Sequence, residues 1–264
     1  MSWMRRLAWL FFAATLYLIL EEAISPWIVL PSLGNVGFTL IFVLFALTHC
    51  AAEEGATRTA AFFSVSAIVS YLMEEIGVRT GAIYGAYHYS DRLGAKLGHV
   101  PFIIPLAWFM MIYPSWTVAQ HLARDVNPRS PVGITALAAV AALVMTAWDL
   151  VMDPGMAAAG VWTWEQGGAY FGVPVHNYVG WLLTTFLVYM VAGWLWRKEV
   201  PGSVTSPVFR TLPVIVYACF ALRYVTAGSR PELQVIALFS MGTPALAALV
   251  QACMKGAALR GQPR

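Results

Sequence analysis

Long runs of apolar residues, separated by short polar stretches, repeat along the whole chain. A helix needs about 20 mostly apolar residues to cross the roughly 30 Å hydrocarbon core of a membrane. Eight runs approach or reach that length, and they cover residues 7–20, 36–52, 57–76, 101–122, 132–152, 177–197, 208–226 and 232–254. The pattern therefore predicts an all-α fold, a polytopic integral membrane bundle of seven to eight transmembrane helices, with residues 1–264 forming a single domain.

The composition agrees with this class of fold. Of the 264 residues, 59% are hydrophobic and 11% are charged, whereas soluble domains carry about 25% charged residues. The net charge of +3 is small, and Lys and Arg lie between the apolar runs instead of on one basic face. We therefore expect membrane lipids, and no nucleic acid, as partners. The three cysteines are far apart, a spacing that predicts neither a disulfide framework nor a CxxC metal site.

The positions of Lys and Arg predict the orientation, because cytoplasmic loops of membrane proteins carry an excess of both residues. With the N-terminus in the cytoplasm, 11 of the 16 Lys and Arg residues fall on the cytoplasmic side and 5 on the other. We expect a multi-pass protein of the cell membrane with both termini cytoplasmic. Pro26, directly after the first run, disfavours signal-peptide cleavage there, so that run is expected to remain as a helix.

Most of the acidic residues fall at the opposite membrane face in this arrangement. Charged groups at membrane depth are unfavourable, by about 2.5 to 3.5 kcal/mol each on insertion scales, and are functional candidates for that reason. The alternative is that they lie at helix ends in the headgroup zone, where water solvates them. The ionisable residues at this face are Glu21, Glu22, Glu74, Glu75, Asp149, Asp153, Glu165 and His176.

The stretch "TAWDLVMDPGM" ends one apolar run and places Asp149 and Asp153 four residues apart. In a helix this spacing puts both side chains on one face, about 5 to 6 Å apart, and Pro154 is expected to end the helix. Two carboxylates this close in a low dielectric do not both ionise easily, so one carboxyl is expected to hold a proton near neutral pH. The pair suits acid/base chemistry, whereas the structural alternative is a helix end with capping carboxylates.

A second polar cluster is "YLMEEIGVRTGAIYGAYHYSDRLG", over residues 71–94. Gly77, Gly81 and Gly85 recur every four residues, so a helix through this segment would carry a glycine stripe that lets another helix approach closely. A packed interfacial helix is the structural alternative to a functional site. The candidate functional residues of this cluster are Glu74, Tyr84, Tyr87 and His88.

A third cluster, "GVWTWEQGGAYFGVPVHNYVGW", follows the aspartates over residues 160–181. Its closely spaced aromatic residues and its glycine pair favour a short hairpin or a re-entrant loop. Trp and Tyr are common in the aromatic belts of membrane proteins. Here acidic and polar residues flank them, so the rings are also candidates for a cavity wall that stabilises a cation, by up to about 2 kcal/mol per ring. The candidates are Trp162, Trp164, Glu165, His176 and Asn177.

Several chemistries lack their characteristic residues in this sequence. The five histidines are isolated from one another, whereas membrane di-iron enzymes need clustered histidines. A GxGxxG fingerprint after a strand, a P-loop and a GxSxG elbow are all missing from the sequence. We therefore expect neither a metal nor an organic cofactor.

Four stretches, in the order in which they occur, resemble the carotenoid hydratase family of bacterial and archaeal carotenoid biosynthesis proteins, which includes the bisanhydrobacterioruberin hydratases. They are "EEIGVRTGAIYGAYHYSD", "PFIIPLAWFMMIYPSW", "AWDLVMDPGM" and "VWTWEQGGAYFGVPVHNYVGW", and the similarity spans roughly residues 71–181. The resemblance implies a cofactor-independent membrane hydro-lyase. Such an enzyme adds water across the terminal C1=C2 double bond of an acyclic carotenoid end and leaves a tertiary hydroxyl. The resemblance assigns no catalytic residues.

Hydration of this kind starts with proton transfer to C2, which leaves a tertiary cation at C1 that water captures. The site needs a positioned acid, aromatic faces toward the cation and a base for the attacking water. The expected catalytic residues are Asp149 and Asp153, the proton-handling pair, and Glu165 or Glu74, a second acid or water-positioning group. The expected substrate-binding residues are Trp162, Trp164, Tyr84 and Tyr87, facing the cation, and His88, His176 and Asn177, orienting water or a carboxyl.

Three other functions remain open at this point. The spacing of Asp149 and Asp153 also resembles half of the magnesium-diphosphate motif of membrane prenyltransferases and carotenoid elongases. Diphosphate favours nearby Lys or Arg, however, and residues 149–176 contain neither. A membrane lycopene cyclase would generate a similar cation and capture it with an internal alkene. A transporter would show two matching halves with broken helices, a symmetry that the sequence does not show.

Overall fold

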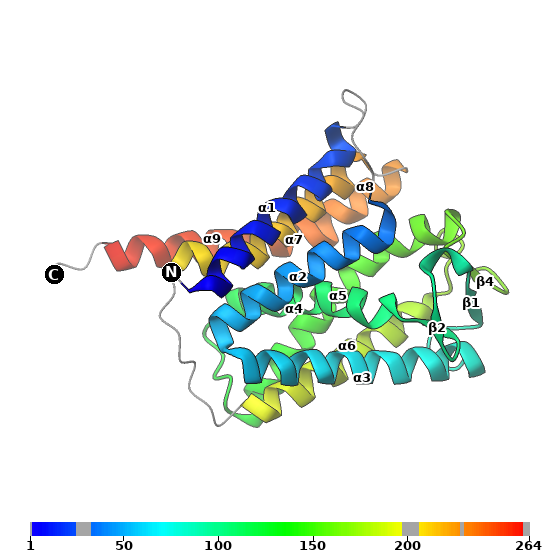
Figure 1. Cartoon of the computed structure of the whole chain (residues 1–264), viewed down its shortest axis with the longest axis horizontal. Helices are drawn as coiled ribbons and strands as arrows, with labels where there is room; N and C mark the ends of the chain where they lie inside the picture. The colour runs from blue at the N-terminus through cyan, green and yellow to red at the C-terminus, as the bar shows by residue number, and fades with distance from the viewer. Residues whose placement is uncertain (1, 25–32, 197–205, 228–229, 261–264) are drawn as a thin grey trace.

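The protein is a bundle of long helices with a small β-structure at one end (Figure 1). The computed structural model describes residues 2–24, 33–196, 206–227 and 230–260, and the side chains of these residues except 22–24 and 255–260. Pro26 and the side chain of Glu22 therefore lie outside the described part. The helices in it are α1 (Trp3–Ile24), α2 (Gly34–Glu54), α3 (Ala56–Thr80), α4 (Ile103–Leu122), α5 (Pro131–Ala158), α6 (Val175–Trp196), α7 (Pro207–Ala227), α8 (Pro231–Ala237), the π-helical turn η2 (Leu238–Gly242) and α9 (Thr243–Arg260).

Seven helical segments of the described residues are long and apolar enough to cross a membrane, with α8, η2 and the first part of α9 forming the last of them. This confirms the predicted all-α polytopic fold. The remaining long helix, α4, packs against α2, α3, α5, α7 and α9, and most of its residues are buried. Because α4 contacts protein on most sides, it does not need the uniformly apolar surface of a helix that faces lipid.

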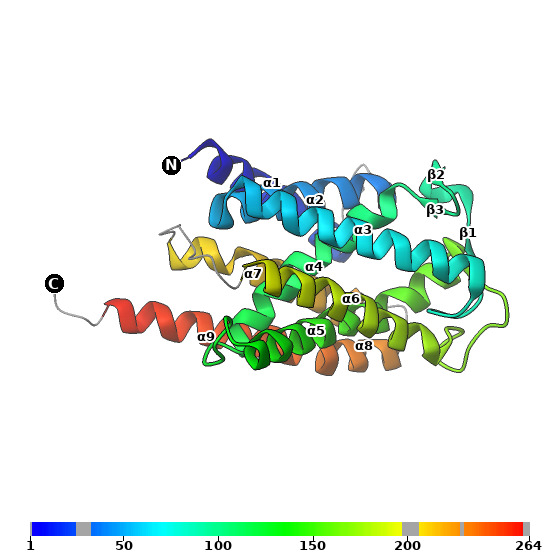
Figure 2. The ribbon, with the colours of Figure 1, turned by 90° about the horizontal axis from the view of Figure 1, so that it is seen from below.

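The two ends of the bundle differ in content. Figures 1 and 2 show α1 beginning and α9 ending at one end, while β1 and β4 lie at the other. The start of α1 and the end of α9 therefore lie at the same end of the bundle, which agrees with the prediction that both termini are on one side of the membrane. That this side is cytoplasmic remains a prediction.

The β-structure joins the second and third polar clusters of the sequence. Strand β1 (Tyr87–Tyr89) pairs antiparallel with β4 (Trp162–Trp164), with Tyr87 opposite Trp164 and Tyr89 opposite Trp162. Successive side chains of a strand point to opposite faces, so these aromatic residues are buried while the middle residue of each strand is exposed. A short hairpin turn does occur within the third cluster, where Tyr170 and Val173 pair antiparallel, whereas the tryptophan segment pairs with the distant strand β1. Beside it lie a 3-10 turn (Asp91–Leu93) and the short pair β2 (Lys96–Leu97) and β3 (Val100–Pro101).

The expected glycine stripe in the second cluster is wrong, because α3 ends at Thr80. Gly81 follows it with φ +68°, and Gly85 has φ +101°, backbone conformations that glycine adopts without strain. Gly77 is still helical, and a Cβ atom there would lie 2.7 Å from the ring of Tyr84. The glycines therefore turn the chain from α3 into β1 and make room for a tyrosine.

Helix α5 continues through Pro154 to Ala158, so the expectation that Pro154 ends the helix is also wrong. A proline inside a helix lacks the N–H that would bond to the carbonyl four residues earlier, here that of Leu150. The hydroxyl of Tyr170 donates to the Leu150 oxygen at 3.0 Å instead. A side chain from another segment thus satisfies the carbonyl that the proline frees.

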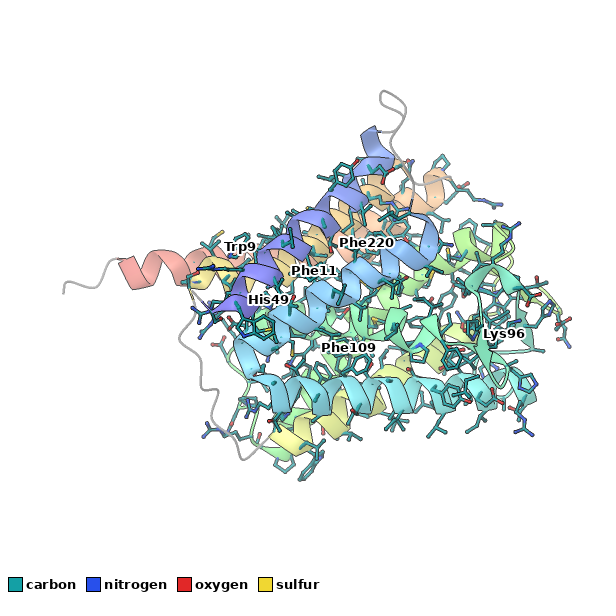
Figure 3. The ribbon with its side chains drawn as sticks, in the orientation of Figure 1. Trp9, Phe11, His49, Lys96, Phe109 and Phe220 are labelled. Carbon is teal, nitrogen blue, oxygen red and sulfur yellow. The ribbon has the colours of Figure 1, made fainter. Side chains whose placement is uncertain are left out.

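A buried histidine plays a comparable part at the other end of the bundle, where Figure 3 labels His49 far from Lys96. Its Nε2 donates to the carbonyl of Phe209 at 2.7 Å, so Nδ1 of the neutral ring accepts from the hydroxyl of Tyr113, also at 2.7 Å. Phe209 lies four residues before Pro213, a proline inside α7. The histidine therefore satisfies a carbonyl that this proline frees, and both of its ring nitrogens are bonded.

Candidate active site

A cavity of about 250 Å³ lies between helices α1 to α7 and the paired strands β1 and β4. Its wall combines apolar and aromatic side chains with a small number of acids, the composition expected of a ligand site. The carboxyl side chains in the wall are Glu21, Glu74, Asp149 and Asp153. Acids from three separate helices, α1, α3 and α5, thus share one space.

Asp149 and Asp153 lie on one face of α5, as their spacing predicts, and the side chain of Asn177 joins them. The Asn177 amide nitrogen donates to Asp149 Oδ2 at 2.9 Å and to Asp153 Oδ2 at 2.6 Å. Asn177 is the third residue of α6, and all three side chains are at most 2% exposed. The two carboxyls are therefore held as one hydrogen-bonded unit away from bulk water.

The two aspartates differ in their remaining oxygen atoms. Asp153 Oδ1 accepts from the indole N–H of Trp162 at 2.6 Å. Asp149 Oδ1 is buried and has no hydrogen-bond partner among the described residues. A buried carboxylate oxygen without a donor is unfavourable, so the surroundings of Asp153 suit a carboxylate better than those of Asp149.

Glu74 of α3 is a separately held acid in the wall of the same cavity. Its Oε2 accepts from the hydroxyls of Tyr87 and Tyr89, the latter at 2.8 Å, and its Oε1 accepts from the indole N–H of Trp108 at 3.0 Å. Burial, followed by the nearby charge of Glu74, raises the pKa of both tyrosines well above its ordinary value. They therefore remain protonated donors, and three donors from β1 and α4 fix the carboxyl of Glu74.

Aromatic rings form much of the remaining wall. Trp108 stacks on Trp181 of α6 with ring centroids 4.0 Å apart, and Tyr87 packs on Trp164 at 4.8 Å. The hydroxyl of Tyr84 is hydrogen-bonded to Thr184 at 2.8 Å, so its ring edge is fixed as well. The structure thus brings together the predicted residues Asp149, Asp153, Glu74, Asn177, Trp162, Trp164, Tyr84 and Tyr87.

Three predicted site residues lie outside this cavity. Glu165 directly follows β4, and its carboxyl contacts Nδ1 of His88 at 2.5 Å on the outer face, where the two side chains are 52% and 59% exposed. His176 is exposed at the start of α6, next to the inward-facing Asn177. Polar residues that lie next to the aromatic residues in the sequence therefore do not all point to the cavity side of the backbone.

Other wall residues escaped the sequence-based prediction. Tyr89 lies two positions after Tyr87, so a strand interpretation of this segment would have placed both on one face. Trp108 and Trp181 lie within long apolar runs, where a tryptophan is most simply interpreted as a core residue. No local pattern marks them as cavity residues, because their role depends on contacts between helices.

Comparison with known proteins places the chain in a family. The family described as "Carotenoid biosynthesis protein" matches it over residues 34–244. Bisanhydrobacterioruberin hydratase of Haloarcula japonica is 37% identical to it over 118 residues, which are 44% of this chain and 39% of that protein. The matched region thus spans well under two thirds of this relative. No solved structure matches the chain. Because the family match covers most of the chain, from α2 into the start of α9, the protein belongs to the family of carotenoid biosynthesis proteins.

Proposed function

We propose that the protein is a membrane carotenoid hydratase that adds water across the terminal C1=C2 double bond of an acyclic carotenoid end group. The observation that carries the proposal is the buried aspartate pair in the wall of an aromatic cavity that also holds Glu74. Family membership and the name of the Haloarcula relative support it. The reaction is that of a cofactor-independent hydro-lyase, because side chains alone supply its acid and its base.

Asp149 is the acid in this proposal. Its Oδ1 lacks a donor among the described residues, whereas both oxygens of Asp153 accept a hydrogen bond. The one proton that the pair holds is therefore more stable on Asp149. A neutral carboxylic acid in the cavity wall donates this proton to C2 of the alkene, and the new C–H bond leaves a tertiary cation at C1.

The wall stabilises this cation in two ways. Faces of Trp164 and Tyr87 attract positive charge, and the carboxylate of Glu74, held by three donors, adds a fixed negative charge. Groups that are already oriented do not need to reorganise as the charge develops. A buried carboxylic acid is a weak acid toward carbon, so protonation depends on this stabilisation of the cation and on close placement.

Water then attacks C1 and transfers a proton to the ionised carboxyl of the pair, Asp153. The substrate gains one oxygen and two hydrogens, while the pair loses one proton to C2 and regains one from water. A proton shift between Asp153 and Asp149, which Asn177 holds together, restores the starting state.

The size of the cavity suits the end of a carotenoid. About 250 Å³ holds an isoprenoid end group and not an entire polyene, so the rest of the molecule would extend out of the cavity into the bilayer. In the cell membrane we propose both termini to be cytoplasmic, as the excess of Lys and Arg on that side favours.

The contacts of the aspartates are less suited to a prenyltransferase. In that reaction magnesium would take carboxylate oxygens as ligands, yet both oxygens of Asp153 already accept N–H groups. The described part of the cavity wall contains one Lys or Arg, Arg223, where diphosphate favours several.

The test is expression in cells that make lycopene or another acyclic carotenoid, in oxygen-labelled water, with chromatography and mass spectrometry of the pigments. A hydratase gives products heavier by one water, with the label in the hydroxyl. Cyclic products of unchanged mass would identify a cyclase instead. Magnesium-dependent products heavier by a prenyl unit would identify a transferase.

A further inference from the structure

The aspartate pair lies on a continuous helix, α5, that lacks one backbone hydrogen bond at the turn joining the two aspartates. Pro154 provides no N–H for Leu150, the residue directly after Asp149. The Leu150 carbonyl is satisfied by the hydroxyl of Tyr170 at 3.0 Å. Tyr170 is absent from the cavity wall, so its hydroxyl touches the backbone of the aspartate helix and not the space for substrate.

The loop around Tyr170 has a specific and strained geometry. Tyr170 and Val173 exchange backbone hydrogen bonds of 3.1 and 2.8 Å across a two-residue turn. Phe171 and Gly172 have φ values of +50° and +90°, as in a type I′ turn. Phe171 is the one non-glycine residue with positive φ in the described part of the chain, and such a conformation is unfavourable for a bulky side chain.

Close packing fixes the same loop from its other side. A Cβ atom on Gly168 would lie 2.0 Å from the carbonyl carbon of Val173, so only glycine fits there. Burial, followed by the charge of Asp149, raises the pKa of Tyr170 to about 12. The hydroxyl therefore remains a hydrogen-bond donor at any working pH.

We propose that Tyr170 is a positioning residue whose hydroxyl replaces the N–H missing at Pro154 and so sets the placement of Asp153 relative to Asp149 and Asn177. Without this donor the Leu150 carbonyl is left unsatisfied, and the turn that carries Asp153 loses one of the contacts that fix it within α5. The proposal rests on the proposed hydratase function for its kinetic test.

The test is a cycle of the variants Tyr170→Phe, Pro154→Ala and the double variant. Tyr170→Phe keeps the ring and removes the donor, and we expect kcat to fall about 10- to 100-fold with KM nearly unchanged, because a displacement on the order of 1 Å lowers rates by such factors. The alanine introduced by Pro154→Ala restores a backbone N–H that reaches the Leu150 carbonyl. In the Pro154→Ala background, Tyr170→Phe is therefore expected to lower kcat less than about threefold, and the double variant to recover the wild-type pH profile that Tyr170→Phe alone shifts.

The matched control is Tyr178→Phe. The Tyr178 hydroxyl is buried and makes no hydrogen bond to any described residue, and its ring lies 5.1 Å from that of Tyr170. This variant removes the same atom next to the same loop, and kcat is expected to stay at the wild-type value. Wild-type kcat in Tyr170→Phe, or an equal loss from Tyr170→Phe with and without Pro154→Ala, would overturn the proposal.

A measurement without substrate separates this proposal from the proposed function. The carboxyl C=O stretching band of the aspartate pair can be identified in infrared spectra by its change in Asp149→Asn. We expect this band to shift in Tyr170→Phe and to return to its wild-type position in the double variant. If the wild type hydrates no carotenoid but the band behaves in this way, the hydratase proposal fails and the positioning role stands. A band that is identical in wild type and Tyr170→Phe overturns the positioning role.

Discussion

His49 and Asp149 are both buried in helices apolar enough to span a membrane, with exposures of 1% and 0%. Their hydrogen bonding is different. Both ring nitrogens of His49 are bonded, to Phe209 and Tyr113. Asp149 retains one oxygen without a partner among the described residues and lines a cavity. A buried polar group that is fully bonded stabilises the fold, whereas one left incompletely bonded beside a cavity is free to act on a ligand.

In both regions a proline inside a helix frees a backbone carbonyl, and a side chain from another element satisfies that carbonyl. His49 does so for Pro213, and Tyr170 for Pro154. The two hydrogen bonds differ in their surroundings. The bond from His49 lies in an apolar core, whereas the bond from Tyr170 lies next to two acids in a cavity wall.

The largest expected effect comes from neutralising the aspartates. Asp149→Asn and Asp153→Asn should each lower the hydration rate by about 10² to 10⁴, the usual contribution of a general acid or base, because each removes one partner of the proton exchange. Pigment analysis of expressing cells gives the rate, and immunoblots of membrane fractions show whether the variants still insert. Full activity in both variants would mean that the aspartates have only a structural role, and the contrast with His49 would disappear.

A smaller loss, on the order of 100-fold in kcat, is expected for Glu74→Gln. The amide keeps the shape of the side chain but removes the negative charge that faces the cation. Glu75→Gln is the matched control, because Glu75 bonds to the backbone and ring of His99, both at 2.9 Å, and is absent from the cavity wall. Equal rates for the two variants would exclude a specific electrostatic role of Glu74.

The His49 region should respond in stability and not in rate. His49→Phe leaves the Phe209 carbonyl and the Tyr113 hydroxyl without partners, and each unsatisfied buried group lowers the free energy of unfolding by about 1 to 3 kcal/mol. Denaturant unfolding in detergent measures this loss, and it should be smaller in a Pro213→Ala background. The kcat of the folded fraction should equal that of the wild type; a fall as large as in Asp149→Asn would show that bonding does not separate structural from functional groups here.

The smallest effect is expected for Glu165→Gln. Its pair with His88 is half exposed, and ion pairs of this kind contribute about 0 to 1 kcal/mol, so kcat and the midpoint of thermal unfolding should change little. Steady-state kinetics and thermal unfolding of the purified variant measure both. A loss of kcat beyond about tenfold would indicate that Glu165 takes part in catalysis and that the active site includes the outer face of the strands.

The helices and the acids at the site could be predicted from the sequence because both depend on short-range pattern. Apolar runs of sufficient length predict helices, and a spacing of four places Asp149 and Asp153 on one face. The side of β4 that faces the cavity could also have been predicted from the sequence. Trp162 and Trp164 alternate with Thr163 and Glu165, so a period of two already puts Glu165 on the opposite face from the tryptophans.

Other features depend on contacts between distant segments and had no local pattern. Strands β1 and β4 are three residues long and pair across two intervening helices. The Leu150 carbonyl that Pro154 frees is satisfied by a hydroxyl sixteen positions after the proline, that of Tyr170. The inward position of Asn177, and the outward position of its neighbour His176, depend on the rotation of α6 against α5.

The pairing of β1 with β4 and the bridge from Asn177 also determine the order in which the site matures during biosynthesis. The donors to Glu74 come from β1 and α4, directly after α3 in the chain, while the donors to Asp149 and Asp153 come from β4 and α6, which the ribosome makes only after α5. Helix α5 therefore leaves the translocon with two carboxyls that have no partners. Because an ionised Asp is unfavourable there by about 2.5 to 3.5 kcal/mol, insertion of α5 favours the protonated acids, and nascent chains halted between α5 and α6 should be the form most exposed to membrane quality control.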